Sequence, residues 1–308
     1  MSTTNATGSA CGMSAAQDGL RTIPCTARRD AAFSLPQHPC FNEAAHGRIA
    51  RIHVPVAPRC NLACAYCERI ISPRHDLSGP GSASGILSPE QGLERTLRFL
   101  DQYGEHAIVG IAGPGDPLAN EETFSFLELL NREVPHVATC LCTNGLALPE
   151  HADRLIHLGV RTLTVTMNGV TPQTVAAMQP GVCDNGTWLD GEEAARLLIA
   201  RQIAGLRAVA GHMTLKVNMV VAPEVNMHEA EAVMRTAEGL GVQVFNPMPL
   251  IPRHALAHRR KPTREELHTV YAKCPPGLAL FRKCKQCRAD AAGIHGKESF
   301  GCQTIDQV

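Results

Sequence analysis

Apolar segments of two kinds alternate along most of the sequence, and this alternation restricts the fold more than any other feature. Short β-branched runs predict strands at residues 48–57, 106–112, 137–142, 162–167, 215–220 and 242–245. Segments with helical spacing predict helices at residues 88–102, 121–132, 149–158, 192–205, 228–238 and 263–271. Such alternation implies parallel strands with right-handed crossovers, and about six units predict a partial (βα)6, TIM-like barrel of the α/β class.

The first predicted strand leads directly into Arg59-Cys60-Asn61-Leu62-Ala63-Cys64-Ala65-Tyr66-Cys67. Three cysteines this close cannot all pair with one another, and the C-x3-C-x2-C spacing lets three thiolates converge on one cubane iron–sulfur cluster. A cluster with three protein ligands keeps one iron open for a substrate or cofactor. The alternatives are buried free cysteines and a zinc site, although the step from Cys60 to Cys64 is not the spacing of a zinc knuckle.

The composition also favours ligation over disulfides. The chain has 13 cysteines, 29 basic and 29 acidic residues, so its balanced charge predicts neither a nucleic-acid nor a membrane partner. Residues 1–17 lack the apolar core of a signal peptide, and no run is long enough to span a membrane. We therefore expect a cytoplasmic protein, whose cysteines in a reducing compartment bind metal or clusters.

Three regions are expected along the chain. Residues 1–36 are rich in Ser, Thr, Ala and Gly without a periodic pattern, and they predict a disordered leader. Residues 37–296 would form the barrel with N- and C-terminal extensions that carry possible cluster ligands. Residues 297–308 would be a tail.

In barrels of this class the chemistry lies at the carboxyl ends of the strands. Four stretches lie at or just past such ends, namely Cys60–Cys67, Gly113–Pro117, Cys140–Asn144 and Asn168. We therefore expect them to face one cavity. Taken alone, Gly113–Pro117 is an ordinary turn between a strand and a helix.

Two groups of possible ligands lie outside the three-cysteine loop. His38 and Cys40 precede the first strand, and taken alone they and Cys140 are a capping histidine and buried core cysteines. Cys284 and Cys287 form a C-x2-C pair among basic neighbours, which favour thiolates. That pair is consistent with half a zinc knuckle, a redox pair or a cluster site.

The run Cys60–Cys67, with Tyr66 before its last cysteine, resembles the signature of the radical S-adenosylmethionine (SAM) enzymes. A narrower resemblance, from His38 to Gly296, is to the NifB family of nitrogenase cofactor maturases. Its strings are weak singly but specific together and in this order: His38-Pro39-Cys40-Phe41, Val56-Ala57-Pro58, Gly110 to Asn120, Thr143-Asn144-Gly145-Leu146, Met248-Pro249-Leu250-Ile251 and Cys284 to Asp290.

The resemblance to radical SAM enzymes implies a [4Fe-4S] cluster on Cys60, Cys64 and Cys67, whose open iron binds SAM. Reductive cleavage of SAM then yields a 5′-deoxyadenosyl radical, and the protein supplies position and exclusion of water.

The same resemblance implies the residues that hold SAM. Gly113 and Gly115 would allow close approach of the methionyl ammonium, and Asp116 would supply the opposite charge. Asn168 and Asn218 would bind the ribose or carboxylate of SAM, but a structural hydrogen-bonding role is at least as good an interpretation.

The resemblance to NifB implies two additional [4Fe-4S] clusters as substrates. One SAM methylates a sulfide, a second SAM provides the radical that takes hydrogen from that methyl group, and the clusters fuse around the carbon into an eight-iron cofactor precursor. His38, Cys40 and Cys140 would hold one substrate cluster, and Cys284 and Cys287 the other. The implied partners are an iron–sulfur scaffold donor, a cofactor carrier or nitrogenase assembly protein, and a reductant such as ferredoxin or flavodoxin.

One departure from the NifB pattern affects the second substrate site. The family usually has a cysteine six residues after Cys67, where this chain has Pro73. The site then has two cysteine ligands, or His75 or Cys274 completes it. The departure keeps open a diverged radical SAM enzyme with another substrate, and a non-catalytic iron–sulfur scaffold or carrier is the second rival. No role is assigned to the other cysteines: Cys11, Cys25, Cys142, Cys183, Cys274 and Cys302.

Overall fold

The computed structural model describes residues 37–73 and 79–297, which belong to one compact unit. The predicted leader, His75 and all but the first residue of the predicted tail lie outside the described residues. The three-region division of the chain therefore stays a prediction.

The main sheet has eight strands in the order β12-β11-β10-β7-β6-β5-β1-β13. Its central six strands are parallel, and they are β1 (Arg51–His53), β5 (Ile108–Ile111), β6 (Ala138–Thr143), β7 (Thr162–Thr166), β10 (Thr214–Val221) and β11 (Val244–Pro249). At the two edges, β12 (Ala279–Leu280) is parallel to β11, and β13 (Ala292–Gly293) is antiparallel to β1. The edges do not pair with each other in the described part of the chain, which confirms the predicted partial barrel.

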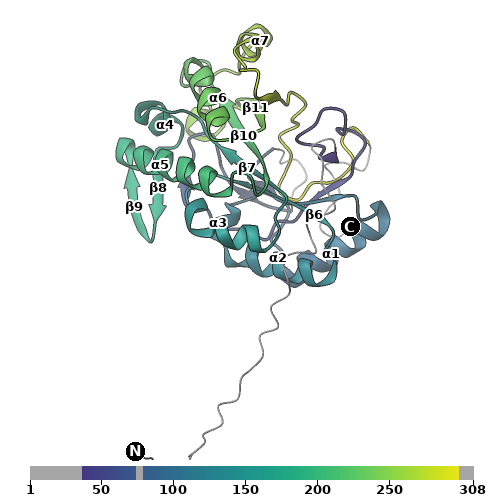
Figure 1. The fold of residues 1–308 in the computed structure, drawn as a ribbon. Helices are drawn as coiled ribbons and strands as arrows, with labels where there is room; N and C mark the ends of the chain where they lie inside the picture. The colour runs from purple at the N-terminus through teal and green to yellow at the C-terminus, as the bar shows by residue number, and fades with distance from the viewer. Residues whose placement is uncertain (1–36, 74–78, 298–308) are drawn as a thin grey trace, which may run out of the picture. The chain divides into compact units, whose positions relative to one another are not determined.

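A helix follows each of the six central strands and lies along the outside of the sheet (Figure 1). These helices are α1 (Pro89–Tyr103), α2 (Glu121–Glu133), α3 (Leu148–His157), α5 (Gly191–Val209), α6 (Ala230–Gly239) and α7 (Arg264–Ala272), with α4 (Pro172–Met178) before α5. Single-turn 3₁₀ helices lie at η3 (Pro117–Ala119), η4 (Met227–Glu229) and η5 (His254–Leu256). The predicted helices are confirmed to within a few residues at their ends.

The start of α1 follows from its first residues. Ser88 caps the helix and accepts a hydrogen bond from the backbone of Gln91, whose side chain in turn accepts one from the Ser88 backbone. Pro89 follows the cap, where its missing N–H costs nothing.

Two strands end four residues away from their predicted ends, and prolines explain both differences. β1 is much shorter than residues 48–57, because Pro55 and Pro58 lack the N–H that a central strand needs. β11 continues through Pro247 and Pro249, beyond the predicted end at residue 245. Its neighbour β12 pairs only with Val244 and Phe245, so the prolines lie where one side of the strand has no partner.

The two faces of the sheet have opposite chemistry. The outward side chains pack with the helices in one apolar core, and among them are Ile52, Leu141, Leu163, Val165 and Val217. The alternate, inward side chains line a cavity, and they include Arg51, His53, Gly110, Cys140, Cys142, Thr164, Lys216 and Asn218. Because side chains alternate along a strand, the same strands build both the core and the cavity.

Two small sheets lie beside the barrel. β2 (Leu62–Ala63) pairs with β8 (Gly181–Asp184), which forms a hairpin with β9 (Thr187–Asp190), and β3 (Ile70–Ile71) pairs with β4 (Ser82–Ala83). Neither the hairpin nor α4 was predicted from the sequence. The Asn185-Gly186 pair, with φ of 48° and 82°, was the available signal, since it is typical of a two-residue hairpin turn.

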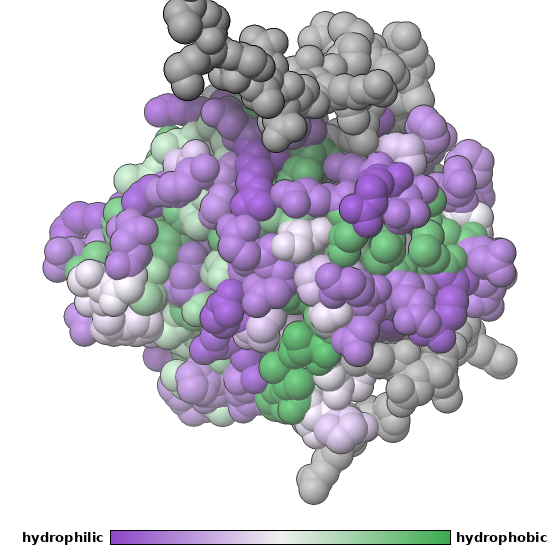
Figure 2. Space-filling view, turned by 90° about the horizontal axis from the view of Figure 1, so that it is seen from below, coloured by the Kyte–Doolittle hydropathy of each residue, from purple (hydrophilic) through white to green (hydrophobic). Residues whose placement is uncertain are grey.

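The surface seen in Figure 2 is mostly hydrophilic, with separate hydrophobic patches between polar side chains. Among the described residues, no helix is both long and apolar enough to cross a membrane.

Candidate active site

The three-cysteine loop lies at the carboxyl end of β1, where two other segments fix it. Leu62 and Ala63 pair with β8, and the Ala65 N–H donates to the carbonyl of Met178 just before that strand. All three cysteines, Cys60, Cys64 and Cys67, line one cavity, which we call the loop cavity.

The loop after β5 is hydrogen-bonded to the segment that begins the three-cysteine loop. The Gly115 and Asp116 N–H groups donate to the carbonyls of Ala57 and Arg59, at 2.7 and 2.8 Å. Asn120 completes the connection, because its side-chain amide donates to the Arg59 carbonyl and its oxygen accepts from the Arg59 N–H. A Cβ on residue 115 would stand 2.0 Å from the Arg59 oxygen, so only glycine fits there.

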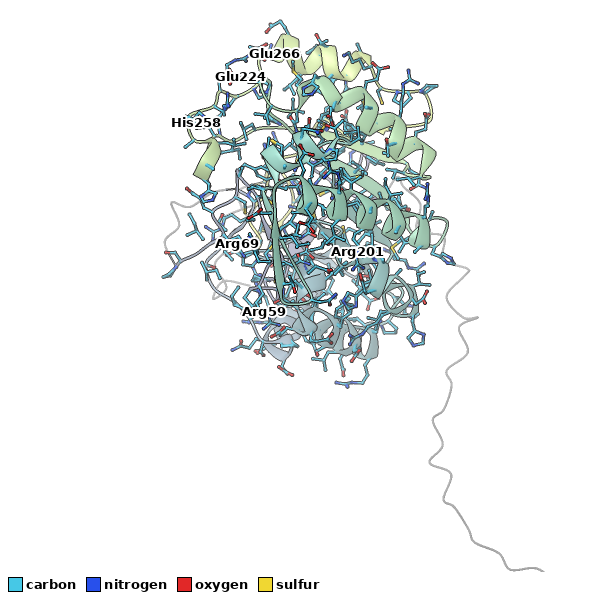
Figure 3. All side chains as sticks on the ribbon, turned by 90° about the vertical axis from the view of Figure 1, so that its left-hand side faces the viewer. Arg59, Arg69, Arg201, Glu224, His258 and Glu266 are labelled. Carbon is cyan, nitrogen blue, oxygen red and sulfur yellow. The ribbon has the colours of Figure 1, made fainter. Side chains whose placement is uncertain are left out.

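The charge around the three sulfurs suits a cationic cluster. Burial, helped by the Asp116 carboxylate, raises the pKa of Cys60 to about 12, and burial also raises the pKa of Cys64 and Cys67. Burial therefore favours the neutral thiols at these positions, and bound iron would favour the thiolates. Arg69 opposes the shift at all three sulfurs, and it lies on the same side of the protein as Arg59 in Figure 3.

The residues of the loop cavity fit a cubane cluster better than a single ion. Gly81 leaves space for the Cys67 sulfur, since a Cβ there would come within 2.9 Å of it. In the described part of the chain, no three His, Cys, Asp or Glu side chains are arranged to hold one metal ion, as structural zinc requires. A cubane takes one thiolate per iron and needs no such convergence.

The predicted SAM-binding loop lies beside the cysteines. Gly115 and Asp116 line the loop cavity, whereas Gly113 does not, and its φ of 118° shows that it is needed for the turn. The Asp116 carboxylate accepts hydrogen bonds from the Asn144 and Leu118 backbones and the Thr143 hydroxyl. Burial raises the pKa of Asp116 to about 6. The carboxylate thus connects the loop after β5 to the end of β6. Its contact with SAM stays a prediction.

The two predicted asparagines occupy different places. Asn168 lines neither cavity. Its side-chain amide donates to the Tyr66 hydroxyl, and its side-chain oxygen accepts from the Val220 N–H. Asn218 lines the interior of the barrel, where its oxygen accepts from Asn246. For Asn168 the contacts match the structural alternative.

A second cavity, which we call the barrel cavity, contains the five residues that the resemblance to NifB assigns to the substrate clusters. Its lining includes His38, Cys40, Cys140, Cys284 and Cys287. These residues are far apart in sequence, but Cys40, Cys140 and Cys284 all pack against the same apolar cluster of Phe41, Val244 and Phe281.

Contacts between the first and last described segments bring these residues together. β13 is antiparallel to β1, and Figure 1 shows the first described residues, in purple, beside the last, in yellow. The Arg282 N–H donates to Glu43 at 2.9 Å across this contact. Asp290 also fixes the last described segment, because it accepts hydrogen bonds from Ser84 and forms an ion pair with Arg288.

Two buried cations face the thiols of the barrel cavity. The Arg51 guanidinium donates to the Cys40 sulfur, and the Lys216 ammonium donates to the Cys40 carbonyl and lies over the Phe41 ring. Burial alone would lower the pKa of Arg51, but Cys40, Cys287 and Cys284 raise it. The positive charges of Arg51 and Lys216 therefore lie beside the thiols of this cavity.

Sequence reasoning missed several polar residues of the barrel cavity, namely His46, His53, His295, Arg51 and Lys216. Arg51, His53 and Lys216 carried a signal, since they are polar residues inside strands that would otherwise be buried. His295 carried none, because it lies outside the periodic segments.

The two cavities share a wall. Tyr66, Cys67, Ala112, Cys142 and Thr166 line both of them. Cys142, to which the sequence assigned no role, thus lines both the loop cavity and the barrel cavity.

Pro73 stands where the NifB pattern has a cysteine, and the structure describes two of the three residues discussed with it. Pro73 is exposed and lines neither cavity, and His75 lies outside the described residues. Cys183 lies in the hairpin, and Cys274 packs against the main core, with its sulfur near the carbonyls of Pro275 and Leu278. Neither cysteine lines a cavity.

Comparisons with known proteins agree with this architecture. The fold is similar to that of Streptococcus suis SuiB, with a TM-score of 0.55 over 78% of this chain and 50% of that chain at 12% identity, and SuiB has also been solved with bound S-adenosylmethionine. The family model of the radical SAM superfamily matches residues 54–237. The fold and the three-cysteine loop thus define a radical SAM enzyme, a class that uses a [4Fe-4S] cluster and SAM.

The particular family follows from closer relatives. The chain is 38% identical to the FeMo cofactor biosynthesis protein NifB of Methanocaldococcus infernus, covering 84% of this chain and 86% of that protein. It is 39% identical to NifB of Klebsiella pneumoniae over 85% of this chain but 57% of that protein, so it spans little more than half of this bacterial relative. The chain belongs to the NifB family.

Proposed function

We propose that this chain builds the eight-iron precursor of the nitrogenase cofactor by fusing two [4Fe-4S] substrate clusters around a carbon from SAM. The observation that carries the proposal is the shared wall between the two cavities. The loop cavity has the three cysteines of a radical SAM centre, and the barrel cavity has thiols and imidazoles beyond it. When bound, the cluster and SAM supply the methyl group and the 5′-deoxyadenosyl radical.

The protein's own residues would position and shield this chemistry. Cys60, Cys64 and Cys67 would hold the resident cluster, and Gly115 lets the neighbouring loop close over it. His38, Cys40 and Cys140 would hold one substrate cluster, with Cys284 and Cys287 on the other. The methyl-transfer and lyase-type steps are part of this proposal.

The compartment and partners are also part of the proposal. All ten cysteines among the described residues are free thiols, which suits the reducing cytoplasm. A cluster-donating scaffold, a cofactor carrier or nitrogenase assembly protein, and a ferredoxin- or flavodoxin-type reductant would act with the enzyme.

The test is to reconstitute the protein with iron and sulfide, add SAM and dithionite, and ask whether the product activates cofactor-free nitrogenase. We expect activation together with 5′-deoxyadenosine. Cys64→Ala should abolish both, whereas Cys274→Ala, a partly buried cysteine outside both cavities, should abolish neither. Deoxyadenosine without activation would instead favour the diverged enzyme, and no deoxyadenosine would favour a scaffold.

A further inference from the structure

The site of Cys284 and Cys287 has fewer predicted cluster ligands than the other two sites. The loop cavity has three cysteines, and the first substrate site has two cysteines and His38. The C-x2-C pair contributes two thiols, and Pro73 is exposed outside both cavities. Another residue that lines the barrel cavity can supply a third ligand for this site.

His295 lies beside Cys287 in the barrel cavity. Its Nε2 lies 3.6 Å from the Cys287 sulfur, its side chain is buried, and it lines the barrel cavity together with both cysteines. Imidazole nitrogen and thiolate together are ligands that iron–sulfur clusters accept, as in centres where histidine replaces cysteine on one iron.

The backbone and one ring hold His295 in this place. Ala292 and Gly293 of β13 pair with Ile52 and Arg51 of β1, so His295 lies two residues after a strand that is paired to the barrel. The ring of His46 packs against that of His295 in a tilted arrangement, with centroids 4.2 Å apart. His46 is fixed in turn by the contact of its Nδ1 with the Pro39 carbonyl.

The distance between the two side chains allows a common cluster. A four-iron cluster carries its ligands on different irons, so the nitrogen and sulfur must separate by a few ångströms when it binds. Rotation about the side-chain bonds of Cys287 or His295 supplies such a movement without a change in the backbone.

We propose that His295 is the third protein ligand of the substrate cluster held by Cys284 and Cys287, and that it binds iron through Nε2. This inference rests on the proposed function, which assigns a substrate cluster to the pair. His46 is a positioning residue that orients the His295 ring.

The experiment compares the full-length protein with His295→Ala and His295→Cys after anaerobic reconstitution. His151→Ala is the matched control, because His151 is a half-buried histidine stacked on Phe124, outside both cavities. Two quantities are measured, the iron bound per folded chain and the nitrogen couplings of the reduced clusters in pulsed electron paramagnetic resonance. Neither measurement needs SAM or nitrogenase.

We expect about twelve irons per chain in the unmodified protein and in His151→Ala, as three four-iron clusters require. His295→Ala should lose about four irons and one nitrogen coupling. His295→Cys should keep the iron and lose the same coupling, because a thiolate replaces the imidazole. This variant decides the question if the alanine variant does not fold.

An unchanged nitrogen coupling in His295→Cys, or full iron with an unchanged coupling in His295→Ala, overturns the assignment. Failure of the proposed function gives a different result. If the unmodified protein binds about twelve irons but its product does not activate nitrogenase, the function fails and the ligand test still stands. If it binds only about four irons, there are no substrate clusters and both proposals fall.

Discussion

At Gly115, the addition of a single methyl group would disturb the candidate active site. This glycine lies where the loop after β5 passes against the three-cysteine loop, and both its N–H and the next one bond to that loop. A methyl group has no space there, since the obstructing atoms are backbone and cannot rotate away. The sequence marked this glycine as a SAM-binding residue, whereas the structure shows a steric reason for it.

We therefore predict that Gly115→Ala separates the two loops. The variant should lose about 3 kcal/mol of unfolding free energy and most SAM cleavage, because the cysteines lose their support. Chemical denaturation and the yield of 5′-deoxyadenosine measure the two effects. Gly239→Ala is the control, because it has open space in α6 and should be neutral or slightly stabilising. Full SAM cleavage by Gly115→Ala would contradict the prediction.

At the scale of elements, the β8–β9 hairpin explains why the three-cysteine loop has a fixed shape. β8 pairs with Leu62 and Ala63 inside the loop, and the Cys183 N–H donates to the Asn61 carbonyl. The hairpin depends on its turn, where Asn185 and Gly186 both have positive φ. The shape of the loop is thus determined by residues about 120 positions away in sequence.

Gly186→Val should weaken this support, because a β-branched residue at positive φ costs about 2 kcal/mol. We expect SAM cleavage to fall several-fold while the iron held in the barrel cavity is unchanged. Gly211→Val is the matched control, since Gly211 also has positive φ and open space but lies after α5, outside both cavities. Equal loss of SAM cleavage in the two variants would show general destabilisation rather than a role for the hairpin.

At the scale of the whole molecule, Asp290 joins the last described segment to the barrel. It accepts hydrogen bonds from Ser84 and Arg288, and Arg95 donates to its carbonyl and to that of His53. Burial alone would raise the pKa of Asp290, but the hydrogen bonds from Arg288 and Ser84 lower it to about 2. This carboxylate holds the segment that carries Cys284 and Cys287.

Stability should therefore depend on pH through Asp290. Its pKa in the folded protein is below the unfolded value of 3.8, so its contribution is present above pH 3.8 and lost as the pH falls towards 2. We predict that Asp290→Asn lowers the unfolding free energy by about 2 kcal/mol at pH 7. Denaturation of both proteins at several pH values should show this difference shrinking below pH 4. A difference independent of pH would contradict it.

The sequence predicted the repeating units of the fold because hydrophobic periodicity is local. Each central strand and its helix were found, and the main errors lie at prolines, in the unpredicted hairpin and at α4. It also identified the ligand candidates, because the resemblance to a family specified them one by one. It did not identify His46 or His295, since nothing local distinguishes a histidine in a loop that later folds against a cavity.

By itself the sequence determined the class of fold, the three-cysteine loop and the family. Only the tertiary structure decided that the predicted ligands, His38, Cys40, Cys140, Cys284 and Cys287, line one cavity, and that this cavity shares a wall with the loop cavity. The physical reason is that both outcomes depend on long-range pairing. β13 must meet β1, and β8 must meet β2, before side chains far apart in the chain become neighbours.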